Sequence, residues 1–277
     1  MGVLIFGRKE AGAKRWIEIG GISFQPAEIC RILLIIYVAN LIENKRSENE
    51  RRSALFGLFS LLLLGSFFIF KQPNLSMALI FIFLGLFLMW ISGMKVRRII
   101  LFLIILFLGG VFYVRKASPS YALKRIRSYT RGKLNYQVRQ ARSALSGSKL
   151  LGTGPLKGKV RLLYLPKLYT DFIFVIVGEE EGLLGTLFLL FIYFLLFLKG
   201  FLIARYCFIK ELYFEGVIAA GVVFNIFLSF AVHVSAVLGI IPTTGMPLPF
   251  ISFGGSSLIS NLFGLGLVCS IERRLEI

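Results

Sequence analysis

Residues 164–185, YLPKLYTDFIFVIVGEEEGLLG, join a basic polar segment to a long apolar run. Asp171 stands at the junction, and Glu179, Glu180 and Glu181 follow inside the apolar run. Carboxylates are costly in hydrocarbon, so an ionisable residue in a membrane segment usually faces a protein interior or a wet cavity and is a candidate functional residue. Acidic residues also favour helix starts, where the helix dipole is positive. For the glutamates both interpretations stay open, whereas the position of Asp171 favours a functional role.

The composition predicts an integral membrane protein. The chain of 277 residues is 57% hydrophobic with a mean hydropathy of +0.80, and its apolar runs are long enough to cross a bilayer repeatedly. A net charge of +18 would suggest nucleic acid as the partner of a soluble chain. In a membrane protein it favours anionic lipid headgroups or a phosphorylated lipid substrate, so we expect no nucleic-acid partner. The three cysteines lie far apart in apolar runs and predict no disulfide framework.

Hydropathy predicts an all-α, polytopic membrane helical bundle of about seven spans with a large extracytoplasmic loop, the whole chain 1–277 forming one membrane domain. The predicted spans are 29–43, 54–70, 76–93, 99–114, 172–198, 212–235 and 253–271. Short basic loops face the cytoplasm. The basic connections are 44–53, 94–98, 199–211 and the C-terminal tail, whereas 71–75 and 236–252 hold one positive charge between them. We therefore expect the N-terminus and the loop 115–171 outside the membrane.

The loop 115–171 contains 14 Lys and Arg residues and no acid before Asp171. Long segments are translocated largely regardless of charge, so this loop does not decide the orientation. Its charge suits a diphosphate and lipid headgroups; the alternative is a solvated basic surface attracted to anionic lipids. Its glycines and the run Ser146-Gly147-Ser148 predict an irregular loop with short helices.

Four blocks of the chain resemble, in the same order, those of the SEDS family (shape, elongation, division, sporulation), the RodA/FtsW-type polytopic polymerases of the bacterial cell wall. The blocks are FQPAE at 24–28, preceded by GAKRW at 12–16, then QPNL at 72–75, the block at 164–182, and LGIIPTTGMPLPFISFGGSS at 238–257. The family has about ten spans, so this chain is expected to be short at its N-terminus, either as a truncated sequence or as a genuine short form. The Tyr-Gln and Tyr-Leu-Pro features slightly favour the FtsW-like division branch.

The chain departs from the family pattern at several positions. Lys167 and Tyr169 replace an acid and a histidine of the usual LPExHTD, and Asn74 replaces the Asp of PDLG. These changes put metal binding and substrate details in doubt, but they leave Asp171 in place. His233 stands where the family usually has Asn. Because it is a lone histidine in an apolar span, we expect a buried polar contact rather than a catalyst.

The resemblance implies an inverting peptidoglycan glycosyltransferase that polymerises lipid II into glycan strands for division or elongation. Asp171 of the TDF motif would be the catalytic general base, accepting a proton from the 4-hydroxyl of lipid II as that oxygen attacks the anomeric carbon of a lipid-carried chain. Undecaprenyl diphosphate would leave, neutralised by cationic side chains or by a divalent cation, Mg²⁺ or Mn²⁺, whose ligands the sequence does not identify. The expected partners are lipid II, undecaprenyl-diphosphate-linked glycan, membrane lipids and a class B penicillin-binding transpeptidase. The expected location is the bacterial cytoplasmic membrane, with the active site facing outside.

The candidate substrate-binding residues come from the basic loop, the glutamates and the serines near the last span. Some match the family's R-I-x-x-F and YQxxQ segments, and others lie close before Asp171 in sequence. They are Arg125, Gln137, Gln140, Lys157, Lys159, Glu179, Glu180, Ser252, Ser256 and Ser257. The alternative for the cations is a role as lipid anchors. The alternative for the serines is to satisfy the backbone of an irregular segment, which at membrane depth must be buried in protein or wet.

Two other classes of function stay open. A lipid II flippase would place charged sites near the bilayer midplane and broken helices in repeat-related positions, but the sequence has no internal repeat and its carboxylates cluster at the outer end. A non-enzymatic divisome scaffold would fit the short N-terminus and the altered loop.

Overall fold

The computed structural model describes residues 7–10, 13–19, 22–44, 48–72, 74–105, 136–158 and 168–276. Its elements, in order, are β1 (Arg8–Glu10), β2 (Ala13–Ile19), β3 (Ile22–Phe24), α2 (Pro26–Asn44), α3 (Glu48–Lys71), α4 (Leu75–Ile91), α7 (Tyr136–Ser146), α9 (Leu168–Asp171), α10 (Ile173–Glu180), α11 (Gly182–Ile209), α12 (Tyr213–Val237) and α13 (Gly255–Leu275). Residues 96–105 are also helical. The predicted all-α bundle is confirmed.

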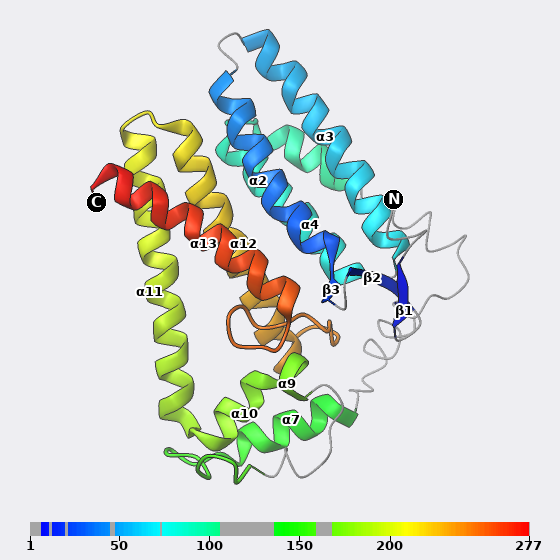
Figure 1. Ribbon diagram of the computed structural model, residues 1–277, viewed down its shortest axis with the longest axis vertical. Helices are drawn as coiled ribbons and strands as arrows, with labels where there is room; N and C mark the ends of the chain where they lie inside the picture. The colour runs from blue at the N-terminus through cyan, green and yellow to red at the C-terminus, as the bar shows by residue number, and fades with distance from the viewer. Residues whose placement is uncertain are drawn as a thin grey trace.

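Helix α12 is the centre of the bundle. It packs against α2, α4, α11 and α13, and Figure 1 shows α11 alongside it at one edge of the molecule. Small residues allow these close approaches, as is usual between membrane helices. A Cβ on Gly221 would lie 2.8 Å from Ile35 of α2, and a Cβ on Gly200 of α11 would lie 2.2 Å from Val223. By contrast, α11 exposes many of its large apolar side chains, including Phe188, as expected for a helix that faces lipid.

Three of the described helices, α11, α12 and α13, are long and apolar enough to cross a membrane. Two shorter apolar helices, Gly57–Lys71 within α3 and Leu75–Ile91, accompany them. The predicted spans at 29–43, 54–70, 76–93, 212–235 and 253–271 all coincide largely with helices. The span predicted at 99–114 lies partly outside the described residues, and the count of seven stays a prediction.

The prediction of one continuous span over 172–198 is wrong. The chain ends α10 at Glu180 and begins α11 at Gly182, which has a positive φ of 68°. Glycine adopts this conformation without the steric cost that a Cβ brings. The apolar run continues through the break, so hydropathy alone does not reveal it.

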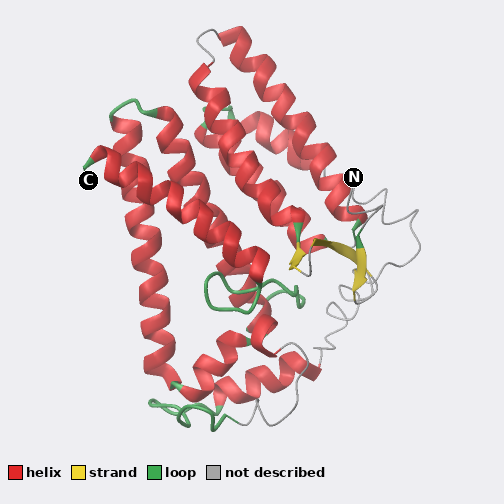
Figure 2. Ribbon diagram, viewed as in Figure 1, coloured by secondary structure: helices red, strands yellow, loops and turns green. Residues whose placement is uncertain are grey.

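The N-terminal residues form a small antiparallel sheet in the order β1-β2-β3, which the sequence analysis did not predict. Figure 2 shows its strands at the foot of α2, away from α11. The sheet leads directly into α2, and the side chain of Arg15 in β2 donates a hydrogen bond to the Gln72 carbonyl (3.2 Å) beyond α3. It therefore fixes how the chain enters the bundle.

The two ends of the bundle differ as the charge pattern predicts. Figure 1 shows the end of α2, the start of α3, the α11–α12 connection and the C-terminus at one end, and α7, α9 and α10 at the other. Lys and Arg residues lie near the first end: Arg51 and Arg52 near the start of α3, Arg205 near the end of α11 with Lys210 just after it, and Arg273 and Arg274 at the C-terminus. The predicted loop 199–211 is therefore mostly helix, because α11 continues to Ile209. Which side of the membrane each end faces stays a prediction. The short helix α7 confirms the expectation of short helices in the 115–171 loop, and it buries Val138 and Ala141 against α10.

Candidate active site

The turn that carries Asp171 is held by the irregular segment between α12 and α13. The Ser252 hydroxyl donates to the Thr170 carbonyl (2.7 Å) and accepts the Leu248 N–H (2.8 Å). The Phe253 N–H donates to the Tyr169 carbonyl (3.1 Å). Through these two bonds Ser252 braces the turn as a positioning residue. They fit the backbone-satisfying alternative of the sequence analysis, and a contact of Ser252 with substrate stays a prediction.

A small polar cavity of about 30 Å³ lies beside Asp171. Gly245, with a φ of 68°, lies next to the carboxylate, since a Cβ there would be in ordinary van der Waals contact with its Oδ2 at 3.6 Å. Gln137 of α7 also lines this cavity, and its role in substrate binding stays a prediction. The remaining lining residues are Phe172, His233, Ala236, Val237, Thr243, Thr244 and Met246. Four separate parts of the chain therefore meet at Asp171.

His233 is a lining residue to which sequence reasoning assigned a buried polar contact but no role in the site. Its ring is 1% exposed, and Nδ1 lies 2.7 Å from the Met246 carbonyl oxygen. The predicted buried polar contact is therefore confirmed. The structure adds that the same ring lines the cavity of Asp171, which lies 62 residues earlier in the chain. No local sequence pattern signals a contact of that separation.

Glu179 and Glu180 close α10, a helix roughly 12 Å long at 1.5 Å per residue, whereas Asp171 lies just before its start. Both side chains are buried. The Glu180 carboxylate accepts the Leu156 N–H (3.0 Å), and a Cβ on Gly158 would lie 2.7 Å from the Glu179 carboxylate. The structure thus places the two glutamates against residues 156–158 and not in the Asp171 cavity.

The same loop completes the backbone hydrogen bonding of the helix break. The N–H groups of Thr153 and Gly154 donate to the Glu179 and Glu180 carbonyls (2.9 and 3.0 Å), which close α10. The first N–H groups of α11, from Leu183 and Leu184, donate to the carbonyls of Lys149 and Leu150 (3.3 and 3.2 Å). Helix ends leave such groups without intrahelical partners, and here the loop supplies them.

The other predicted binding residues differ in what the structure shows. Lys157 is exposed, and Gln140 is half-buried on α7. Arg125 and Lys159 lie outside the described residues.

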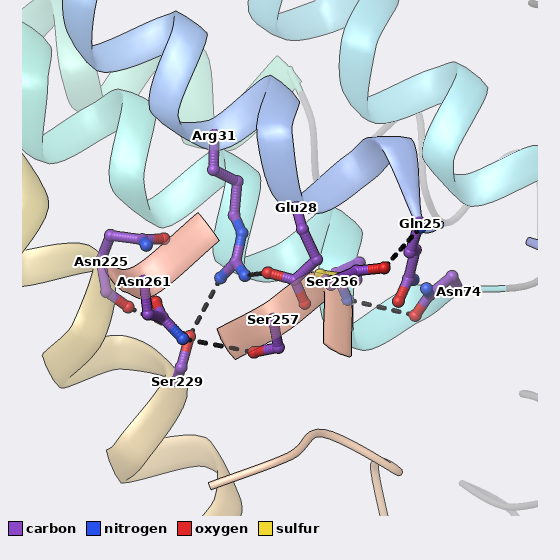
Figure 3. A network of polar contacts seen from close by, with 10 residues as sticks. Gln25, Glu28, Arg31, Asn74, Asn225, Ser229, Ser256, Ser257 and Asn261 are labelled. Atoms are coloured by element: carbon purple, nitrogen blue, oxygen red, sulfur yellow. Dashed lines mark hydrogen bonds and ion pairs between the residues drawn. The ribbon is translucent and has the colours of Figure 1, made fainter. Parts of the chain in front are cut away.

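Ser256 and Ser257 belong to a second polar cluster, inside the bundle between α2, α12 and α13 (Figure 3). Ser256 accepts the Gln25 N–H (3.0 Å), and Ser257 accepts from Asn261 (3.2 Å). Both serines are buried, so the structure places them in helix packing and not at the Asp171 cavity.

The centre of this cluster is a buried ion pair within α2. Glu28 and Arg31 are each 1% exposed and are joined carboxylate to guanidinium, and Arg31 Nη1 also donates to Ser229 (3.0 Å) (Figure 3). Sequence reasoning missed this pair, although an acid and a base three residues apart at the start of an apolar run are a usable signal. A charge buried in this way needs its partner.

The described residues around Asp171 do not form a divalent-cation site on their own. Asp171 is the only carboxylate among the residues that line its cavity. Within the described parts of the chain no group of three or more His, Cys, Asp or Glu side chains is placed to hold a metal ion. We therefore derive no chemical step through a metal.

Fold and site together define a multi-pass helical membrane protein with an acidic pocket at one end of its bundle. The family model that matches residues 1–277 is that of the FtsW/RodA/SpoVE proteins, described as "Cell cycle protein". This chain belongs to that family.

Similar proteins of known sequence cover almost the whole chain. A protein of Wigglesworthia glossinidia brevipalpis named "Probable peptidoglycan glycosyltransferase FtsW" is 34% identical over 99% of this chain and 73% of its own length. A protein of the same name from Buchnera aphidicola subsp. Schizaphis graminum is 32% identical over 99% of this chain and 79% of its own length. The FtsW names agree with the branch that the sequence favoured.

Solved structures share the fold. A chain from a structure titled "Structural coordination of polymerization and crosslinking by a peptidoglycan synthase complex" matches with a TM-score of 0.79 at 27% identity, over 98% of this chain and 76% of the other. The rod shape determining protein RodA of Thermus thermophilus matches with a TM-score of 0.65 at 26% identity, over 98% of this chain and 73% of the other.

Proposed function

We propose that this protein is a peptidoglycan glycosyltransferase that polymerises lipid II with inversion at the anomeric carbon. The observation that carries the proposal is Asp171, a carboxylate on a braced turn beside a polar cavity at one end of an otherwise apolar bundle. The names of its relatives support the same reaction.

Asp171 acts as the general base. The 4-hydroxyl of the incoming lipid II loses its proton to the carboxylate as its oxygen attacks the anomeric carbon of the lipid-carried chain, and the bond to the diphosphate breaks. A positioned base contributes typically 10²–10⁴-fold to such a step. Ser252 keeps the carboxylate in place through the Thr170 carbonyl, and Gln137 and the two threonines of the cavity offer hydrogen bonds to sugar hydroxyls and amides.

The diphosphate leaving group requires positive charge. The basic loop supplies it in this proposal, with Lys157 on the described part and Arg125 and Lys159 on the remainder. A divalent cation, Mg²⁺ or Mn²⁺, would add positive charge at the diphosphate, and the described protein residues do not form a cage for it.

The proposed setting is the outer side of the bacterial cytoplasmic membrane. Undecaprenyl-diphosphate-linked glycan, lipid II and membrane lipids are the proposed ligands, and a class B penicillin-binding transpeptidase is the proposed protein partner. Similarity to a chain of a peptidoglycan synthase complex supports a partner of this kind. The basic short connections at the opposite end of the bundle support the orientation.

Lipid II transport is a second candidate, favoured by one observation. The ion pair of Glu28 and Arg31 is buried inside the bundle, and buried ionisable groups of membrane helices often mark transport paths. A transporter would move labelled lipid II across a vesicle membrane without lengthening it.

The test is the purified chain in proteoliposomes with labelled lipid II, alone and with a class B transpeptidase. Glycan strands visible by gel electrophoresis support the glycosyltransferase. Transbilayer movement without polymerisation supports transport. If the transpeptidase binds but neither activity appears, the protein is a scaffold.

A further inference from the structure

One ring nitrogen of His233 makes a hydrogen bond, and the other makes none to the described residues. A carbonyl oxygen only accepts hydrogen bonds, so the contact to Met246 requires Nδ1 to carry the hydrogen. In the neutral ring this makes Nε2 a bare acceptor. Nε2 is buried and makes no hydrogen bond to any described residue. A buried polar atom of this kind is costly unless a ligand or water completes it.

The surroundings of the ring point to Asp171 as its functional neighbour. Both residues line the same cavity, whose volume of about 30 Å³ has room for one or two water molecules. Asp171 is the only charged group among the lining residues, and α7 contributes the uncharged Gln137. Of the other packed helices, α11 brings Tyr193, whose hydroxyl is bonded to the Pro249 carbonyl. The charged pair of α2 is joined to α12 at Ser229, about one turn away from the ring.

We propose that His233 is a proton-relay residue for Asp171, receiving at Nε2 the proton that the carboxylate removes from the attacking hydroxyl. The inference rests on the proposed glycosyltransferase function and adds a residue to it. Fixing the ring through Nδ1 is what a relay needs, because a hydrogen bond at one ring nitrogen sets the tautomer and orientation of the other.

The relay adds one proton transfer to the glycosyl transfer. The hydroxyl O–H bond breaks, its oxygen bonds to the anomeric carbon, and the diphosphate leaves with the electron pair of the broken C–O bond. The proton passes to Asp171 and then through the cavity to Nε2. The imidazolium keeps its bond to Met246 and faces an ionised Asp171, ready for the next sugar once it releases the proton to solvent. A polymerising enzyme must reset its base at every addition, and the relay provides that reset.

The experiment compares the pH dependence of lipid II polymerisation by the full chain in proteoliposomes. The variants are His233→Asn and His233→Gln, which keep a polar side chain but do not titrate, and Asp171→Asn as the reference. Asn225→Ala is the matched control, since Asn225 is buried on the same helix and is not among the residues that line the cavity. The relay predicts that kcat of the His233 variants falls about tenfold or more while KM stays within about twofold, a modest general acid–base effect.

The pH profile separates a relay from a packing role. The relay needs a neutral His233 ring to receive the proton, so the acidic limb of the wild-type profile should move to lower pH in both non-titrating His233 variants and stay in place in Asn225→Ala. An unchanged kcat, or a lower kcat with the wild-type profile, overturns the relay.

If neither His233 variant folds, a wild-type acidic limb no higher than that of an ordinary carboxylate, about pH 4, overturns the relay, and a limb at higher pH supports it. Polymerisation that depends on Asp171 but not on His233 removes the relay and leaves the proposed function intact. A wild-type chain that makes no glycan at any pH contradicts both.

Discussion

The contact between two glycines at the break of α10 and α11 gives a prediction that depends only on the fold. Gly182 has a φ of 68°, and a Cβ there would lie 2.2 Å from the backbone nitrogen of Gly152. Gly152 itself has a φ of 71°, and its own Cβ would lie 2.2 Å from the Glu180 carbonyl oxygen. Neither the loop nor the helices can approach in this way with a side chain between them.

The expected cost of Gly182→Ala has two parts. Placing a non-glycine residue in the left-handed region costs roughly 1–2 kcal/mol. Pushing the loop away breaks up to four backbone hydrogen bonds at the break, each worth about 0.5–1.5 kcal/mol. The sum is about 3–8 kcal/mol if all four are lost, or a fall of at least several degrees in the thermal unfolding midpoint at about 2–4 °C per kcal/mol.

The assay is thermal unfolding of the purified variants in detergent, with Gly266→Ala as the matched control. Gly266 is an exposed residue inside α13, where nothing lies within 4 Å of an added Cβ. This control should be neutral or more stable by up to about 1 kcal/mol, because alanine is the better helix former. Equal midpoints for Gly182→Ala and Gly266→Ala would refute the argument that the loop closes the break.

Three further predictions concern the positioning serine, the buried ion pair and the topology. Ser252→Ala should lower polymerisation substantially with little change in membrane insertion, because misplacing a catalytic group by 1 Å can cost about 10²-fold; wild-type rates would mean that the turn holds without it. Glu28→Ala should destabilise the protein by about 3–5 kcal/mol by leaving a buried guanidinium without its carboxylate, and adding Arg31→Met should recover part of that loss in thermal unfolding; a double variant no more stable than the single one contradicts this. In a cysteine-free background, a cysteine at position Ser148 should be labelled from outside intact cells and one at Ser53 should not, and the reverse pattern would invert the orientation.

Much of the fold could be predicted from the sequence because lipid imposes a simple rule. Apolar runs of sufficient length become helices, since every backbone group must be satisfied within the segment. Asp171 was recognisable for the same reason. A carboxylate beside an apolar run is costly in lipid, so its presence there usually has a functional cause. The sequence also indicated that the serines near the last span form polar contacts, but it did not distinguish the different contact that each one makes. Ser252 braces the turn and Ser256 bonds to Gln25, and only three-dimensional contacts distinguish the two.

Two features that sequence missed, the helix break and the place of His233, depend on contacts between distant residues. The break before Gly182 is stabilised by a loop about 30 residues earlier. The apolar run continues across the break, so hydropathy does not indicate it. His233 reaches the cavity of Asp171 only because the irregular segment after α12 folds back over the end of the bundle. Its neighbours in sequence are apolar, so periodicity gives no sign of the site.

The central claim is that Asp171 is the base of a polymerising active site, and Asp171→Asn tests it most directly. The amide keeps the size and most hydrogen bonds of the carboxylate but does not accept a proton. We predict a loss of at least about a hundredfold in lipid II polymerisation, in line with general-base effects, with unchanged thermal unfolding and unchanged binding of the transpeptidase. A variant that polymerises lipid II at nearly the wild-type rate would reduce Asp171 to a helix-start residue and contradict the account.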